Sequence, residues 1–88
     1  MLKIQRAATG AVVLFTLSGR IQADKVPELQ RLFDLEANKR HLTLDLQAVT
    51  LVDREAVRFL TRCEADGITL VHCQAYIRVW IEQEKVQP

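Results

Sequence analysis

The sequence predicts a small α/β domain in which helices pack on a mixed β-sheet, in the order β-β-α-β-α-β-α. Leu42, Leu44 and Leu46 alternate with polar residues, and a period of two is typical of a strand with one buried face. The run at 11–17, AVVLFTL, is apolar almost throughout and rich in residues that favour strands. A stretch with apolar residues at helical spacing lies between these two strands, and another follows them. Such stretches favour crossover helices between parallel strands.

A β-hairpin is expected at the start of the chain. Residues 2–8 suit an edge strand, and Thr9-Gly10 is a turn signal. The apolar run 11–17 then forms the second strand, and Ser18-Gly19 is expected to end it. Two strands joined by so short a turn pair antiparallel.

A first helix is expected over 24–38. Asp24 can cap it, and Pro27 is tolerated because it falls in the first turn. Asn38-Lys39 suits the end of the helix. The apolar stripe consists of Val26, Leu29, Leu32, Phe33 and Ala37.

The central strand leads into a second helix. Its alternation changes after Val49 and Val52, which indicates a short loop. Asp53 follows as a good N-cap residue. The apolar residues that then recur at helical spacing are Ala56, Phe59, Leu60 and Cys63.

A short strand and a third helix complete the chain. Asp66-Gly67 is expected to stop the second helix, and the run 68–72, ITLVH, reads as a strand. The stretch 74–85 has features of both a strand and a helix. Its length and the good helix formers near its end favour a helix.

Length and charge restrict the class of protein. Eighty-eight residues are expected to form a single domain over 1–88 with a modest core. The formal net charge of +1 gives no reason to expect a nucleic-acid partner. No apolar run approaches the roughly 20 residues that span a bilayer, so membrane insertion is not expected. The N-terminus, MLKIQR, lacks the apolar core of a signal peptide.

The two cysteines favour a reducing compartment. Cys63 lies on the apolar face of the second helix and Cys73 ends a strand, without the C-x-x-C spacing of redox and metal motifs. We interpret both as reduced, mostly buried thiols, with a disulfide or a metal site as the minor alternative. A cytoplasmic protein without a cofactor is expected.

The junction between the central strand and the second helix carries a resemblance. The pattern D-L-x-x-V-x-x-V-D from Asp45 to Asp53, followed by a helix, resembles the STAS domain, which anti-sigma factor antagonists share with the cytoplasmic tails of sulfate transporters. The segment L-S-G-R-I at 17–21 is similar to that family's second-strand exit. Members often carry an acidic residue where this chain has Gln22. The resemblance implies the STAS fold and a regulatory interaction module.

The resemblance also shows what this chain lacks. Phospho-regulated STAS proteins carry D-S-x-G at the start of the second helix, where free N–H groups and the helix dipole receive the added phosphate. Here the serine position is occupied by Arg54, followed by Glu55 and Ala56, so there is no phosphoacceptor at this place. Either the switch was lost or the domain is recognised constitutively.

Arginines form one ridge on the second helix, which we call the arginine ridge: Arg54, Arg58 and Arg62. Like charges four residues apart oppose a helix, and Arg54 sits at the positive end of the helix dipole. Glu55 and Asp66 could neutralise the ridge in solvent. Alternatively the ridge is a partner-binding surface, because STAS partners commonly dock on this helix and arginine is favoured at interfaces. The candidate partner-binding residues are Asp53, Arg54, Glu55, Arg58 and Arg62.

A second candidate surface is formed by Tyr76 and Trp80 on the third helix, although a large aromatic there is more often part of the core. Asp53 is also more readily explained as a structural cap than as a contact residue. His41 and His72 are far apart and lack the spacing of metal ligands, so no metal site is expected.

Three functions compete. The first is a non-catalytic protein–protein interaction module, whose partner could be a kinase-like anti-sigma factor, a transporter ATPase or another copy of the chain. The alternative is a small-ligand or nucleotide sensor that binds an anion at the N-terminus of the second helix, although no Gly-rich phosphate loop supports it. Catalysis is not expected, because the sequence offers no nucleophile beside a base and no metal cluster.

Overall fold

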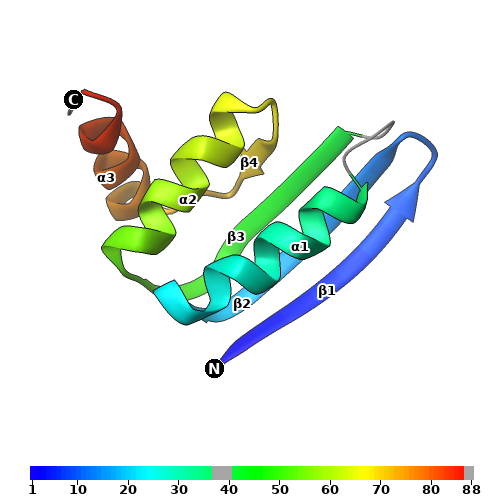
Figure 1. Ribbon diagram of the computed structural model, residues 1–88, viewed down its shortest axis with the longest axis horizontal. Helices are drawn as coiled ribbons and strands as arrows, with labels where there is room; N and C mark the ends of the chain where they lie inside the picture. The colour runs from blue at the N-terminus through cyan, green and yellow to red at the C-terminus, as the bar shows by residue number, and fades with distance from the viewer. Residues whose placement is uncertain (37–40, 87–88) are drawn as a thin grey trace.

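The computed structural model describes residues 1–36 and 41–86. Strands and helices follow in the predicted order, with one short 3₁₀ turn added before the first helix (Figure 1). The elements are β1 (Leu2–Thr9), β2 (Val12–Ile21), η1 (Ala23–Lys25), α1 (Val26–Glu36), β3 (His41–Val52), α2 (Arg54–Ala65), β4 (Thr69–Val71) and α3 (Ala75–Lys85). The predicted small α/β fold with a mixed sheet is confirmed.

The sheet has the order β1-β2-β3-β4. β1 and β2 form the expected antiparallel hairpin, whereas β2–β3 and β3–β4 are parallel. Buried and less buried side chains alternate along β2, so one face of the sheet points into the core. α1 and α2 lie across that face in Figure 1, and α3 lies beside α2.

Three aromatic rings tie the two layers together. Phe15 of β2 meets Phe33 of α1 with ring centroids 5.1 Å apart, and Phe33 stacks on Phe59 of α2 at 5.7 Å. All three side chains are at most 2% exposed. These rings place part of the core where β2, α1 and α2 meet. The Asp53 N–H donates to the Ile21 carbonyl oxygen at 3.3 Å, which holds the start of α2 beside the end of β2.

β2 is longer than predicted. Ser18-Gly19 does not end it, because the strand continues to Ile21. Gly19 has φ +98°, and a Cβ atom there would lie 2.2 Å from the carbonyl oxygen of Met1. Glycine thus allows β1 to approach the strand closely, rather than terminating it.

The predicted loop after the central strand is also wrong. β3 runs without interruption to Val52, and only Asp53 separates it from α2. The register with β2 shifts twice, and each shift inserts one extra residue into β3. Buried positions are therefore two apart up to Leu46 and then three apart at Val49 and Val52. The change of period marks two bulges.

The start of the first helix differs as well. Asp24 lies within the 3₁₀ turn η1, and the helix proper begins at Val26 with Pro27 in its first turn, as expected. Asp24 is therefore not the N-cap residue. The predicted helix end at Asn38-Lys39, and Ala37 of the apolar stripe, lie outside the described residues.

The last elements agree with the sequence analysis. α2 ends at Ala65 and Gly67 adopts φ +94°, as a helix stop requires. β4 is a strand of three residues, and the ambiguous segment near the C-terminus is helical. None of the helices within 1–36 and 41–86 has the length and apolar character needed to cross a membrane.

Candidate partner-binding site

Asp53 joins two elements at the start of α2. Its Oδ1 accepts a hydrogen bond from the Ala56 N–H at 2.9 Å, which is the predicted N-cap contact. Its Oδ2 accepts a second bond, from the Ala23 N–H at 2.8 Å in η1. One carboxylate therefore fixes both the first turn of α2 and the segment that leaves β2. Both oxygens already bind backbone donors of the chain itself.

The arginine ridge lies on the surface of α2, as predicted. The side chain of Arg54 is 58% exposed and that of Arg58 is 44% exposed, and Arg62 is exposed as well. The opposite side of the helix is buried and consists of Ala56, Val57, Phe59, Leu60 and Cys63. The three arginines therefore lie on the exposed side of α2, opposite its buried face.

A carboxylate from α3 lies under the first half of this ridge. Glu84 Oε1 is 3.2 Å from Nε of Arg54 and 3.7 Å from Nε of Arg58. The Glu84 side chain is only 9% exposed, so the two guanidinium groups cover it. The sequence analysis missed Glu84, because nothing local indicates that the end of α3 returns to the start of α2.

The arginine ridge was expected to be neutralised by Glu55 and Asp66, and only Glu55 is placed to do so. Glu55 Oε1 is 3.3 Å from Nη1 of Arg58, as the spacing predicted. No ion pair joins Asp66 to Arg62 among the described residues, and Asp66 instead ends the helix through its backbone N–H. Arg62 has no ion-pair partner within 4.0 Å in this part of the chain.

A second ion-pair network locks the other end of α2 to α3. Arg78 donates two hydrogen bonds of 2.9 Å to the two carboxylate oxygens of Glu64, and Lys85 donates another of 2.9 Å. Glu82 also accepts a hydrogen bond from each of these two side chains, Arg78 and Lys85. A bidentate arginine–carboxylate pair is among the stronger polar contacts in proteins. Together with Glu84, these contacts hold α3 against α2 at two places.

The pKa of Glu64 falls from an ordinary 4.5 to about 2, because first Arg78 and then Lys85 donate hydrogen bonds to it. The network therefore stabilises the fold fully above about pH 4.5 and less and less as the pH falls toward 2. We expect Glu64→Gln to lower the free energy of unfolding at pH 7 by about 1 kcal/mol. This is less than the pKa shift alone suggests, since solvent screens the pair.

Urea unfolding at pH 7 and pH 3 tests this expectation. The difference between wild type and Glu64→Gln should shrink as the pH is lowered. Glu82→Gln is the matched control, because Glu82 is 54% exposed and accepts longer bonds, and its effect should stay below about 0.5 kcal/mol. A difference for Glu64→Gln that stays constant with pH would contradict the role of the carboxylate charge.

The predicted second surface divides into two parts. Tyr76 is 48% exposed, whereas Trp80 is partly buried against the core. The buried side of α3 is formed by Ile77 and Ile81, and Val79 on the outer side is 57% exposed. Only the outer side, with Tyr76 and Val79, is accessible to a partner.

A polar cluster surrounds the first bulge of β3. The Gln74 side chain donates to the carbonyl oxygens of Leu46 and Gln47 at 3.4 and 3.2 Å, and also to that of Val49. Asp45 accepts from the Gln47 N–H and lies 3.2 Å from Nδ1 of His72. These contacts satisfy backbone groups that the bulge leaves unpaired. The sequence analysis assigned no role to Gln74, and it missed the Asp45–His72 contact.

The cysteines carry no activated thiolate. Both are free, with Cys63 buried and Cys73 half-buried. Burial raises the pKa of Cys63 to about 12, and it also raises the pKa of Cys73. Within the described ranges, no three His, Cys, Asp or Glu side chains gather in a way that could hold a metal ion.

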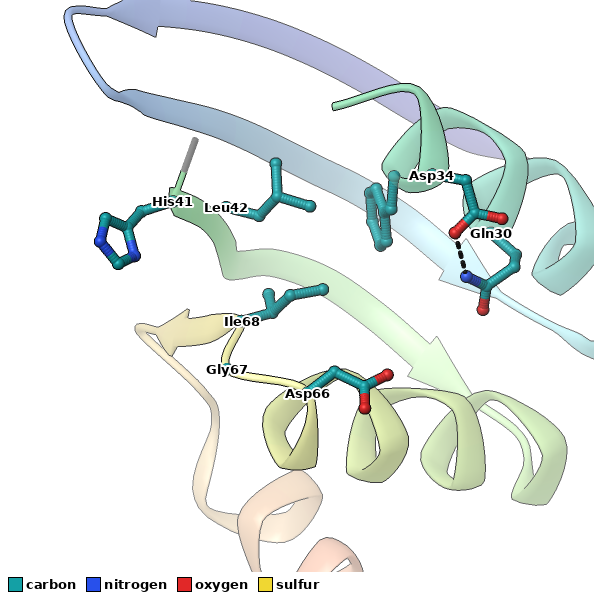
Figure 2. A pocket seen from close by; sticks show the side chains of 8 residues that line it. Gln30, Asp34, His41, Leu42, Asp66, Gly67 and Ile68 are labelled. Carbon is teal, nitrogen blue, oxygen red and sulfur yellow. Dashed lines mark hydrogen bonds between the residues drawn. The ribbon is translucent and has the colours of Figure 1, made fainter. Parts of the chain in front are cut away.

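One cavity of about 280 Å³ lies at the opposite end of α2 from Asp53 (Figure 2). It opens between the end of α1, the start of β3 and the turn after α2. Gln30 donates to Asp34 at 2.8 Å, and the His41 ring points away from the other labelled side chains. The lining residues are Gln30, Phe33, Asp34, His41, Leu42, Asp66, Gly67 and Ile68. The cavity includes none of the predicted site residues.

Solved structures with a similar fold include three regulators. An anti-sigma factor antagonist STAS domain from Rhodobacter sphaeroides aligns with a TM-score of 0.66 and 13% identity, over 81% of this chain and 86% of that one. The anti-sigma factor antagonist SpoIIAA in its unphosphorylated form aligns with a TM-score of 0.71 and 12% identity, over 91% and 82%. An anti-sigma factor antagonist from Mycobacterium paratuberculosis aligns with a TM-score of 0.64 and 16% identity, over 80% of this chain and 64% of that one.

Sequence comparison adds nothing to these matches, because no family model and no curated protein matches the chain. At identities this low, the likeness concerns the fold. The order of strands and helices, the mixed four-stranded sheet and the capped start of α2 all agree with the resemblance found in the sequence. The chain folds as a STAS-like domain of the type seen in anti-sigma factor antagonists.

Proposed function

We propose that this chain is a non-catalytic regulatory module that binds an acidic surface of a protein partner through the arginine ridge of α2. The observation that carries the proposal is the continuous exposure of Arg54, Arg58 and Arg62 on one side of a helix whose other side is buried. A helix selected for stability alone would not align three like charges. The fold supports the proposal, since similar structures belong to anti-sigma factor antagonists.

Binding is proposed to be independent of phosphorylation at the start of α2. The residue after Asp53 is Arg54, and neither Glu55 nor Ala56 carries a hydroxyl group. Asp53 is included in the proposed contact surface, although its carboxylate also holds two backbone N–H groups. Glu55 lies beside Arg58 and limits the net charge of this end of the ridge.

Glu84 is proposed to compete with the partner. Its carboxylate already neutralises part of Arg54 and Arg58, whereas Arg62 has no such neighbour within the described residues. A partner carboxylate therefore gains most at Arg62 and must share the other two cations. We expect Glu84→Gln to strengthen partner binding and Arg62→Glu to weaken it, each by several-fold, because opposite charges across an interface speed association and like charges oppose it.

Charge reversal with a preserved helix contact tests the proposal. The variant Arg54→Glu/Arg58→Glu/Arg62→Glu with Glu84→Lys inverts the ridge but keeps opposite charges between α2 and α3. The matched control is Arg20→Glu/Lys25→Glu/Arg31→Glu, which reverses three charges on β2, η1 and α1 and leaves the residues of α2 unchanged. Affinity purification followed by mass spectrometry would compare both with wild type.

We expect one or more proteins to be lost with the inverted ridge and kept with the control. Circular dichroism must show that both variants are folded. An unchanged set of bound proteins would refute the ridge as the binding surface.

The ligand-sensor alternative is weaker in this geometry. An anion at the start of α2 would find the Ala56 N–H already bonded to the Asp53 carboxylate and Arg54 already paired with the Glu84 carboxylate. Two negative groups therefore stand where a phosphate would bind. A thermal-shift screen with nucleotides is expected to show no stabilisation, and a clear rise in Tm with one of them would favour a sensor.

A further inference from the structure

The outer edge of β1 has no strand beside it in the described part of the chain. β1 is the end strand of the sheet and pairs only with β2. Its register runs without a shift from Leu2, opposite Gly19, to Thr9, opposite Val12. The edge is therefore eight residues long and regular. Figure 1 shows it on the rim of the molecule, beyond α1.

The pairing with β2 tells which backbone groups point outward. The Arg20 N–H donates to the Met1 carbonyl oxygen at 3.1 Å, so Met1 directs its backbone toward β2. In an antiparallel pair this direction alternates along the strand. The outward N–H and C=O groups therefore belong to Leu2, Ile4, Arg6 and Ala8.

β1 carries only some of the features that usually block such an edge. Proteins protect edge strands with proline, a bulge, charged side chains, a very short strand or a covering element. The sequence LKIQRAAT contains no proline, and its pairing with β2 contains no bulge. Its two charged residues, Lys3 and Arg6, are of the kind that protects an edge, but in the register proposed below each lies opposite an uncharged residue. α1 reaches β1 through the 2.7 Å ion pair between Arg6 and Glu36.

We propose that β1 pairs antiparallel with β1 of a second copy of this chain, around a two-fold axis at Gln5. This inference concerns a surface other than the arginine ridge. In this register Leu2 lies opposite Ala8, Lys3 opposite Ala7, and Ile4 opposite Arg6, so no two charged residues lie directly opposite each other. All outward backbone groups then find partners, because the residues that expose them are opposite one another.

Neighbouring registers are less favourable. A shift that places the axis at Arg6 brings two arginines face to face, and like charges directly opposite destabilise a pair of strands. A shift to Ile4 leaves Thr9 and Ala8 without partners. With the axis at Gln5, even-numbered residues of both copies point to the same face, so both helix layers lie on one side of a continuous sheet.

Apolar side chains along this rim gain cover from the pairing. Leu2, Ile4 and Leu32 pack only partly against the core. Leu32 lies one turn before Glu36 on the flank of α1 that reaches Arg6. In the proposed register Ala8 of the second copy would lie opposite Leu2, and the two Ile4 side chains would be diagonal neighbours on the same face. The interface thus combines backbone hydrogen bonds with apolar contacts at Leu2 and Ile4.

Sedimentation velocity on the full chain over a range of concentrations tests the proposal, and the mass of two chains is expected. Gln5→Glu and Gln5→Lys each place like charges at the axis and should weaken self-association about fivefold or more. Mixing these two variants should restore the dimer, because Glu and Lys then lie opposite each other. Gln83→Glu, the same change on the exposed side of α3, should leave association unchanged.

Hydrogen exchange gives a second readout. Dimer formation should slow the amides of Ile4 and Arg6, which face outward, whereas those of Gln5 and Ala7 already bond to β2. A chain that stays monomeric at every concentration would overturn the proposal. So would a dimer that both Gln5 variants form as well as wild type, since its interface would then lie elsewhere.

Discussion

Phe59→Ala is expected to lower the free energy of unfolding by about 3–5 kcal/mol. Phe59 is fully buried in the middle of α2, and its ring stacks on Phe33 with centroids 5.7 Å apart. Removing it leaves a cavity between α2 and α1 and takes the stacking partner from Phe33. A domain of 88 residues has roughly 4–13 kcal/mol of stability in total, so this one change removes a large share of it.

Chemical denaturation followed by tryptophan fluorescence and circular dichroism would measure this loss. Val79→Ala on α3 is the control, because Val79 is 57% exposed and its truncation should change stability by less than about 0.5 kcal/mol. Phe59→Leu should fall between the two, since it keeps most of the apolar volume. A loss below about 1.5 kcal/mol for Phe59→Ala would mean that α1 and α2 close readily over the cavity.

Features that local chemistry determines were predictable from the sequence. The turn at Thr9-Gly10, the cap at Asp53 and the stop at Asp66-Gly67 follow from preferences of single residues for particular backbone conformations. The alternation from Leu42 to Leu46 likewise indicates a strand with one buried face. Together with the STAS resemblance, these signals were sufficient for the order of the elements.

Features that depend on distant segments were not predictable. The spacing of three between Leu46, Val49 and Val52 looked like the end of a strand, because a bulge has no signature apart from the partner strand that it faces. Gly19 looked like a strand end because the close approach of Met1 cannot be seen from the sequence alone.

The candidate site shows the same division. Helical spacing places Arg54, Arg58 and Arg62 on one ridge, and the structure puts all three at the surface. The same spacing predicts the Glu55–Arg58 pair. It does not predict Glu84, which lies near the C-terminal end of α3 and comes close to Arg58 only in the folded chain. Sequence reasoning therefore placed the three arginines at the surface, whereas the net charge around them depends on how α3 docks on α2. That docking rests on Glu64 and Arg78 as well as on Glu84.

Asp53→Ala is expected to destabilise the fold by about 2 kcal/mol, more than an ordinary N-cap substitution. The usual loss comes from the hydrogen bond of 2.9 Å that the Ala56 N–H donates to Asp53 Oδ1. A further loss comes from the hydrogen bond of 2.8 Å that the Ala23 N–H donates to Oδ2. This bond ties η1 to α2. Urea unfolding of the full chain at pH 7 would measure both together.

Asp53→Asn separates the two contacts. Its amide oxygen can still accept from Ala56, but its NH₂ group cannot accept from Ala23, so about half of the loss should remain. Asp24→Ala is the control, because Asp24 lies in η1 and caps no helix, and its effect should be below about 0.5 kcal/mol. If Asp53→Ala cost no more than Asp24→Ala, the carboxylate would be free for another role, and its place in the proposed contact surface would become the better explanation for an aspartate there.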